Sequence, residues 1–219
     1  MTHPPESEAV EERLADRIGV LRIPERPSRW AAAQLRRLGR VDRAAYRAVA
    51  GMSTPWLDTP LRVVSDAANF SKPWLATAAV LAFVDGPKGR RAAATGVVAI
   101  AVTSFMVNQP MKLAGDRRRP DRQQLGVPAD RWVSMPESTS FPSGHSASAA
   151  AFAVSVGDVL PTLRAPLRVA ASVVAFSRVY TGVHYPSDVL VGVAVGALLG
   201  RTTSGVARRI RCAPRTRRS

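Results

Sequence analysis

The chain contains five mostly apolar segments, all of them after residue 72. They cover residues 73–84, 92–107, 144–156, 165–176 and 189–199. Each is shorter than the roughly 20 residues that a lone transmembrane helix needs, so a soluble all-helical core is one interpretation. The membrane is favoured because the interruptions are mainly Gly, Ala, Ser and Thr, which let helices pack closely in lipid, while flanking Arg and Lys side chains can extend to the interface. We predict an all-α, helical-bundle integral membrane protein with about five transmembrane helices.

Two amphipathic stretches precede these segments. Residues 29–52 show a helical period, with Asp42, Arg43 and Arg47 lying off the face that carries the apolar side chains. That apolar face is formed by Val41, Ala45, Ala48, Val49 and Met52. The pattern predicts a basic helix in the membrane interface, with a surface helix on a soluble domain as the alternative. Pro55 and Pro60 then mark a second short helix, over about residues 57–68.

The composition divides the chain into four regions. Residues 1–28 are polar and hold four prolines, which predicts a disordered tail without a signal peptide. Residues 29–70 form the amphipathic helical region, 71–203 the membrane core, and 204–219 a basic tail.

The net charge of the chain limits the classes of molecule that it is expected to bind. The net charge is +15, and only Lys72, Lys88 and Lys112 among the 31 basic residues are lysines. Such a surplus fits nucleic acid, anionic lipid or an anionic substrate, and the planar Arg fork matches phosphate oxygens. The basic tail lacks the aromatic residues that stack on single-stranded bases, so we expect it to contact lipid headgroups and no nucleic acid. The lone Cys212 excludes a disulfide framework and a cysteine metal site.

The first of three chemically rich stretches runs from Lys112 to Pro120. Lys112 and Arg119 are seven residues apart and share one face if the helix from Ala92 continues to Pro120. Fixed cations suit phosphoryl transfer, in which negative charge spreads over three oxygens. Taken alone, the arginine run also fits a solvated membrane flank. Two roles stay open for the remaining arginines: selecting the headgroup of the substrate, or simply lying at the protein surface. These residues are Arg117, Arg118, Arg122 and Arg131.

The second stretch follows Pro142 and opens an Ala-rich helix. Ser143, Gly144 and His145 then lie at a helix N-terminus, where free N–H groups and the helix dipole favour an anion. Ser143 is either a phosphate ligand or an N-cap. Gly144 allows a phosphate to approach the backbone closely, and His145 is placed to give a proton to a leaving oxygen.

The third stretch joins Arg178, at the end of an apolar segment, to His184 and Asp188. A carboxylate on the far ring nitrogen fixes a histidine's tautomer and stabilises its imidazolium form. Because Pro186 interrupts a regular helix, we expect His184 in a loop and Asp188 at a helix start, where a simple N-cap is the alternative role for Asp188.

The three stretches together resemble the type-2 phosphatidic acid phosphatase and vanadium haloperoxidase superfamily. Its signature, Lys-x6-Arg-Pro, Pro-Ser-Gly-His and Ser-Arg-x5-His-x3-Asp, is complete here and in order. The segment around Pro142 resembles the bacterial membrane lipid-phosphatase branch. The resemblance implies His184 as the nucleophile that forms a phosphohistidine, His145 as the general acid and Asp188 as the residue that orients His184. It implies no metal and no cofactor, and a phosphate cradle formed by Lys112, Arg119, Ser143, Gly144 and Arg178.

These features predict a membrane phosphatase for a lipid phosphate or diphosphate. Polyprenyl diphosphate, a polyprenyl-phosphosugar phosphate, phosphatidic acid and phosphatidylglycerol phosphate all present the same terminal group, so the motifs leave the substrate open. A vanadate-dependent haloperoxidase and a non-catalytic lipid-phosphate-binding membrane protein are the alternatives. Apart from substrate and membrane lipids, the motifs name no partner, and the oligomeric state stays open.

Topology follows from charge. One apolar segment separates the motifs from the basic tail, and the loops at 85–91 and 158–168 are basic like the tail. Cytoplasmic loops carry the excess of Lys and Arg, so we expect the cell membrane as location and an outward-facing site. Many membrane members of the family that the chain resembles have three transmembrane helices before the first motif. Here two precede Lys112, and the amphipathic region takes the place of the first.

Overall fold

The computed structural model describes residues 29–112 and 117–212, and within these ranges all regular structure is helical. The predicted disordered tail at 1–28 and the last residues of the basic tail lie outside the described part. Residues from Arg40 onward form one unit, described here by itself. The other unit contributes only residues 29–39, the beginning of the first described helix.

The predicted helices are present. The helical elements are α2 (Arg29–Ala50), α3 (Pro55–Ala67), η1 (Asn69–Ser71), α4 (Lys72–Val84), α5 (Gly86–Met106), the π-helical turn η2 (Val107–Met111), η3 (Ala129–Arg131), α7 (Gly144–Val159), η4 (Pro161–Leu163), α8 (Arg164–Tyr180) and α9 (Pro186–Cys212). The five apolar segments correspond to α4, α5, α7, α8 and α9. Among the described residues, two helices are long and apolar enough to cross a membrane, Gly86–Met111 and Pro186–Cys212.

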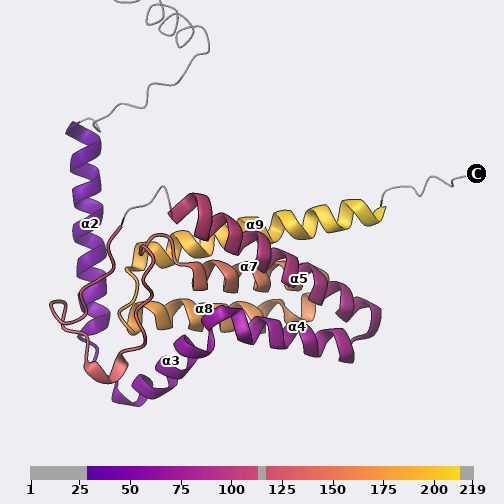
Figure 1. Ribbon diagram of the computed structural model, residues 1–219, viewed down its shortest axis with the longest axis horizontal. Helices are drawn as coiled ribbons and strands as arrows, with labels where there is room; N and C mark the ends of the chain where they lie inside the picture. Colours follow the sequence, from indigo (N-terminus) through magenta and orange to yellow (C-terminus); the bar gives the residue numbers. More distant parts are fainter. Residues whose placement is uncertain (1–28, 113–116, 213–219) are drawn as a thin grey trace, which may run out of the picture. The chain divides into compact units, whose positions relative to one another are not determined.

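Helix α7 is the centre of the bundle. It packs against α5, α8 and α9, while α4 packs against α5 (Figure 1). Nearly every residue of α7 from Ser146 to Gly157 is buried, and the ring of Phe152 lies 5.5 Å from that of Trp74 on α4. This burial explains why α7 has no polar face and why its sequence reads as a continuous run of Ala and Ser.

The small residues predicted to bring helices together do so along α9. A Cβ atom added to Gly192, Gly196 or Gly200 would lie 2.5, 2.0 or 2.5 Å from the backbone oxygens of Ser143, Ala147 and Ala151. Real Cβ atoms do not approach oxygens this closely, so the α7 and α9 backbones are in direct contact only because these positions are glycine. The contact also fixes where α9 carries its first turn relative to the start of α7.

The first motif departs from its prediction. The α-helix from Gly86 ends at Met106, the chain continues as the π-helical η2 to Lys112, and residues 117–121 have no helical structure. Lys112 and Arg119 therefore do not share a helix face. Pro110 provides the physical reason, because a proline inside a helix lacks the N–H for the i→i−4 bond and disturbs the regular α pattern.

Helix α2 also differs from the simplest expectation. Its predicted apolar face is largely exposed, with Val41 62% accessible, whereas Asp42, Tyr46 and Ala50 are buried against the rest of the unit. The protein therefore binds α2 through a carboxylate and a tyrosine and leaves the apolar face free, an arrangement that suits a helix lying in a membrane interface.

Candidate active site

The third motif forms a tight turn between α8 and α9. His184 lies in this turn and Asp188 in the first turn of α9, as predicted. The backbone N–H groups of Val183 and His184 both donate to the carbonyl oxygen of Arg178, at 3.2 and 3.1 Å. The His184 side chain is almost fully buried and the Asp188 side chain completely so. The turn therefore fixes the imidazole rigidly beside the buried carboxylate.

Asp188 is surrounded by donors. Its Oδ2 accepts the Ser140 hydroxyl at 2.5 Å and the backbone N–H of Tyr185 at 2.9 Å, and its Oδ1 accepts the Arg117 guanidinium at 2.7 Å. A carboxylate with this many partners is held both in its ionised form and in one orientation. The simple N-cap alternative is thus incomplete, because Asp188 also binds side chains from two other segments.

The ring of His184 has two distinct sides. Nδ1 lies 3.5 Å from the Ser140 hydroxyl and 3.7 Å from Oδ2 of Asp188, so Ser140 lies close to both the imidazole and the carboxylate. Nε2 lies 3.2 Å from a nitrogen of Arg119. Because guanidinium only donates, Nε2 is the acceptor and the ring proton belongs on Nδ1. This tautomer leaves a lone pair on Nε2.

Surroundings keep His184 neutral. Burial lowers its pKa to about 4; Asp188 opposes this shift, and the charges of Arg119 and Arg178 strengthen it. At neutral pH the Nε2 lone pair is therefore free of a proton, as a nucleophile requires.

Lys112 and Arg119 meet although no helix carries both of them. Both donate to the Ser138 hydroxyl, at 2.9 and 3.3 Å. Arg119 also donates to the carbonyl oxygens of Ser138, Thr139 and Val183, which hold the guanidinium beside His184. Burial, followed by the charge of Arg119, lowers the pKa of Lys112. Two mutually repelling cations held this closely favour an anion between them.

Arg178 supplies a third cation from the last turn of α8. It is 1% accessible and donates to the carbonyl oxygen and hydroxyl of Ser65, at 3.0 and 2.7 Å. Its Nε has no hydrogen-bond partner, and no carboxylate within the described ranges pairs with it. A buried guanidinium left without a counter-charge is costly unless an anion binds.

The second motif begins α7 as predicted. Ser143 is buried, makes no side-chain capping bond, and its hydroxyl lies 2.9 Å from that of Ser146, so capping is not its function. A Cβ on Gly144 would come no closer than 3.6 Å to Asn108, so packing alone does not require glycine here. His145 Nε2 lies 2.9 Å from the amide oxygen of Asn69.

A cavity of about 620 Å³ joins five of the predicted site residues, Lys112, Arg119, Gly144, His145 and His184, whereas Ser143, Arg178 and Asp188 do not line it. Its wall combines charged and polar side chains with the apolar side chains of Ala68, Phe70, Leu75 and Ile100. Its lining residues include Lys112, Arg119, Ser138, Gly144, His145, His184, Asn69, Ser104, Asn108 and Ser148. A separate hollow of about 570 Å³ between α3 and α8 is lined mainly by apolar side chains and by none of the predicted site residues.

Two residues near the site, Ser140 and Asn69, were not singled out by the sequence, and Arg117 was considered only for headgroup selection or as a surface residue. Ser140 and Asn69 contact His184 and His145, and Arg117 binds Asp188. By contrast, Arg122 binds the Val133 carbonyl and stacks on Trp132, and the buried Arg131 pairs with Asp58, so neither lines the cavity. Within the described residues, no three His, Cys, Asp or Glu side chains are grouped as a metal site would need.

Comparison with known proteins identifies the family. Residues 93–211 match the PAP2 superfamily, a stretch that covers more than half of the chain and includes all three motifs. The chain belongs to the PAP2 superfamily. A decaprenylphosphoryl-5-phosphoribose phosphatase of Mycolicibacterium smegmatis is 35% identical over 153 residues, which are 68% of this chain and 77% of that protein. This PAP2 membership, with the two apolar helices, places the chain in a membrane.

Other PAP2 relatives match over shorter stretches. The protein of the same name from Mycobacterium tuberculosis is 40% identical over 94 residues, 41% of this chain, and the match spans about half (48%) of that relative. A Rhizobium johnstonii lipid A 1-phosphatase is 40% identical over 30% of this chain and 27% of its own.

Solved PAP2 structures share the fold. A transmembrane phosphatidylglycerolphosphate phosphatase from Bacillus subtilis superposes with a TM-score of 0.62 and 25% identity, covering 82% of this chain and 89% of that one. LpxE from Aquifex aeolicus gives a TM-score of 0.58 at 22% identity, covering 73% and 92%, which is a likeness of fold alone.

Proposed function

We propose that this chain is a membrane phosphatase that removes the terminal phosphate of a lipid through a phosphohistidine on His184. One observation carries the proposal. The Nε2 atom of His184 is unprotonated, lies beside Arg119, and faces a cavity that also contains Lys112 and His145. A nucleophile, fixed cations and an acid thus surround one space of a size that admits a phosphate and part of a lipid.

The first half-reaction is an in-line displacement at phosphorus. Nε2 of His184 attacks, the new P–N bond forms, and the bond from phosphorus to the lipid oxygen breaks. His145, which binds a proton when the phosphate dianion lies beside it, gives that proton to the departing oxygen, while Asp188 balances the positive charge that develops on the imidazole. Lys112, Arg119, Arg178 and the backbone N–H group of Gly144 stabilise the three equatorial oxygens, while the N–H of Ser143 donates to the carbonyl oxygen of Asp188 at 3.0 Å.

Water completes the cycle in the second half-reaction. His145, now neutral, takes a proton from a water molecule that attacks phosphorus. The P–N bond breaks, inorganic phosphate leaves, and both histidines return to their starting states. The chain supplies three cations of its own, and we propose that turnover needs no metal ion.

We favour a polyprenyl-phosphosugar phosphate as substrate. The Mycolicibacterium smegmatis relative, of which this chain covers 77%, is named for decaprenylphosphoryl-5-phosphoribose. The cavity supports this choice, because Asn69, Ser104, Asn108 and Ser148 add polar groups that can bind sugar hydroxyls next to an apolar wall suited to the prenyl chain.

Phosphate release by the detergent-purified protein tests the proposal. The substrates are decaprenylphosphoryl-5-phosphoribose, undecaprenyl diphosphate, phosphatidic acid and phosphatidylglycerol phosphate, each with EDTA and with the His184→Ala variant beside the wild type. We expect release from the phosphosugar lipid that persists in EDTA and falls by about 10⁴-fold in the variant. Release that His184→Ala retains would overturn the mechanism, and loss in EDTA would overturn metal independence.

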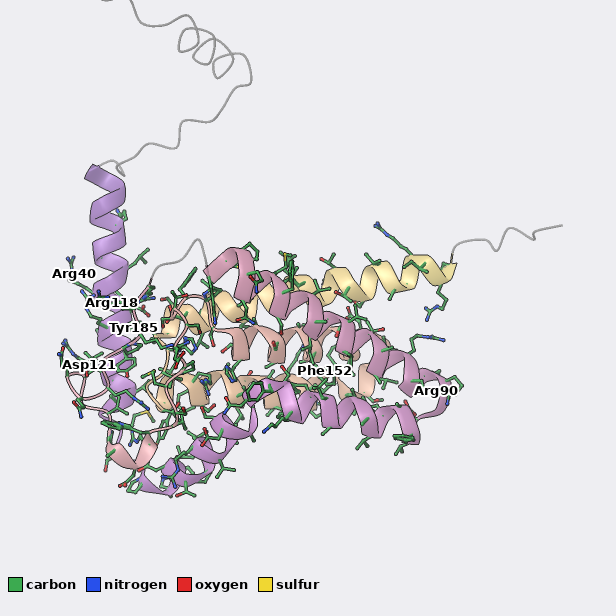
Figure 2. The ribbon with its side chains drawn as sticks, in the orientation of Figure 1. Arg40, Arg90, Arg118, Asp121, Phe152 and Tyr185 are labelled. Carbon is green, nitrogen blue, oxygen red and sulfur yellow. The ribbon has the colours of Figure 1, made fainter. Side chains whose placement is uncertain are left out.

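We propose an outward-facing site in the cell membrane. The cavity lies at the end of the bundle that carries Tyr185, whereas Arg90 lies at the other end (Figure 2). Basic loops favour the cytoplasm. The single, exposed Cys212 offers a test. A membrane-impermeant maleimide should label Cys212 only after permeabilisation, and should label an Arg118→Cys, Cys212→Ser variant in intact cells. The reverse pattern would invert the orientation.

A further inference from the structure

A charged network behind the site links α2 to the residue that orients His184. The guanidinium of Arg117 binds Oδ1 of Asp188 at 2.7 Å and Oδ2 of Asp42 at 2.5 Å. Both carboxylates are buried, with side chains 7% and 0% accessible, while Arg117 retains 30%. One cation therefore neutralises two buried anions, each of which would be unfavourable if left alone.

The same aspartate holds the start of α9. Oδ1 of Asp42 accepts the backbone N–H of Ser187 at 2.9 Å, and its Oδ2 accepts the Ser187 hydroxyl at 2.7 Å. That hydroxyl also accepts from Arg117 at 2.7 Å. Asp42 thus provides from α2 the capping acceptor that the first turn of α9 needs. Because Asp188 is the next residue, the cap fixes the backbone that carries the carboxylate.

The ring of Tyr185 completes the arrangement. The guanidinium carbon of Arg117 lies 4.1 Å from the centre of this ring, which stacks against Tyr46 of α2 with the centroids 5.5 Å apart. The hydroxyl of Tyr46 donates to the carbonyl oxygen of Gly182 at 3.0 Å, so α2 contacts both ends of the turn that holds His184. Gly182 has φ +74°, and a Cβ there would lie 2.7 Å from that hydroxyl.

Anchoring of α2 does not depend on Asp42. The buried Arg131 donates to the carbonyl oxygens of Val49, Ala50 and Met52 and pairs with Asp58 on α3. These bonds satisfy the C-terminal end of α2 and tie it to α3 independently of the site. The Asp42–Arg117 pair is therefore free to act on the site rather than to hold the helix.

We propose that Arg117 and Asp42 are positioning residues for the phosphatase reaction, acting through Asp188 on His184. Arg117 fixes the free oxygen of Asp188, so that the other oxygen stays directed to Ser140 and the Nδ1 side of His184. Asp42 fixes Arg117 and the first turn of α9. The inference rests on the proposed function, because it concerns the orientation of that nucleophile. Neither residue lines the cavity, so binding of the substrate phosphate does not depend on them.

Steady-state kinetics of Arg117→Ala and Asp42→Asn test the proposal, with Arg118→Ala as the matched control. Arg118 belongs to the same segment, is exposed, and makes no hydrogen bond or ion pair with the described residues. We expect kcat to fall about 10–100-fold in the two test variants, as for other groups that orient a functional histidine. KM should stay within about threefold, and Arg118→Ala should change neither constant by more than about twofold. The loss of kcat in the double variant should not exceed the loss in the less active of the two single variants, because both residues act through one network.

Two further readouts separate positioning from folding. Millimolar guanidinium ion, added to Arg117→Ala, should restore kcat several-fold by occupying the space between the two carboxylates, and should leave Arg118→Ala unchanged. Inhibition by vanadate, used as a phosphate analogue, should keep its wild-type constant in every variant, because the cradle is intact. A kcat for Arg117→Ala equal to that of Arg118→Ala would overturn the proposal. So would loss of vanadate inhibition in parallel with kcat, without rescue, since it would assign the pair to folding alone.

The wild type distinguishes this failure from failure of the proposed function. A wild-type protein that releases no phosphate from any of the four lipids removes the reaction itself and the positioning proposal with it. A wild type that turns over, beside an Arg117→Ala variant that is equally fast, refutes only the positioning proposal.

Discussion

Arginines at the two ends of the bundle behave in opposite ways. At the end with the cavity, Arg117, Arg119, Arg131 and Arg178 are buried or half-buried and bind fixed partners. At the other end, the arginines in the first turns of α5 and α8 and in the last turns of α9 are exposed, and the one ion pair that the described residues form there, Arg164–Asp158, measures 4.0 Å. The same side chain therefore provides a preorganised anion site at one end and a solvated, membrane-orienting charge at the other.

This difference predicts unequal effects of removing one arginine. Arg119→Ala should lower kcat/KM by about 10²–10³-fold, because it removes a preorganised donor to the phosphate and the contact with Nε2 of His184. Phosphate release in detergent, compared with Arg90→Ala from the other end, measures it. Equal losses in the two variants would erase the distinction between the ends.

Gly144→Ala tests whether the cavity end is built for an anion rather than for packing. The added Cβ meets nothing closer than 3.6 Å, so the thermal unfolding midpoint should stay that of the wild type. The Cβ does occupy the side on which a phosphate approaches the helix start, and kcat/KM should fall about 10–100-fold. A destabilised variant, or one with full activity, would contradict this reading of the second motif.

The pH dependence sharpens the electrostatic side of the comparison. The nucleophile must be neutral, and burial lowers the pKa of His184 to about 4. The acid limb of kcat/KM from His184 should therefore lie near pH 4 instead of 6.5, with activity lost as the pH falls through it. Arg119→Gln removes a charge that lowers this pKa, so the limb should move to higher pH. An acid limb that stays in place in this variant would contradict the influence of Arg119 on His184.

The smallest effect is expected at the basic end. Arg208→Gln with Arg209→Gln should leave kcat in detergent within about twofold of the wild type, because these side chains are exposed and remote from the cavity. Each exposed basic residue near an anionic membrane contributes about 1 kcal/mol of attraction. A peptide of residues 201–219 that carries both substitutions should therefore bind anionic vesicles more weakly than the wild-type peptide, and the difference should shrink as salt is added. A large loss of kcat in detergent would mean that this end takes part in the reaction.

Local sequence predicted most of the fold and the positions of the motif residues. Five apolar segments became five helices, and the prolines at 142 and 186 correctly placed His145 in a first helical turn, His184 in a loop and Asp188 at a helix start. These features depend on nearby residues, and helix period and proline chemistry describe such features well. The functions assigned to the motif residues remain predictions.

What local patterns missed depends on distant partners. The α-helix expected through Lys112 and Arg119 ends at Met106, and the distant Ser138 brings the two cations together. Asp42 lies 145 positions before Ser187, and on a helical wheel it is merely a polar residue off the apolar face. Its burial follows from Arg117 and the start of α9, which no period in the sequence of α2 reveals.

Trapping the covalent intermediate tests the central claim most directly. The wild type is mixed with a lipid labelled in its terminal phosphate, quenched in alkali within the first turnover, digested, and the labelled peptide sequenced by mass spectrometry. The structure predicts phosphate on a ring nitrogen of His184, formed before free phosphate appears and absent from His184→Ala. Release of labelled phosphate at the full rate with no phosphohistidine at any time point would contradict it, because water would then attack the lipid phosphate directly.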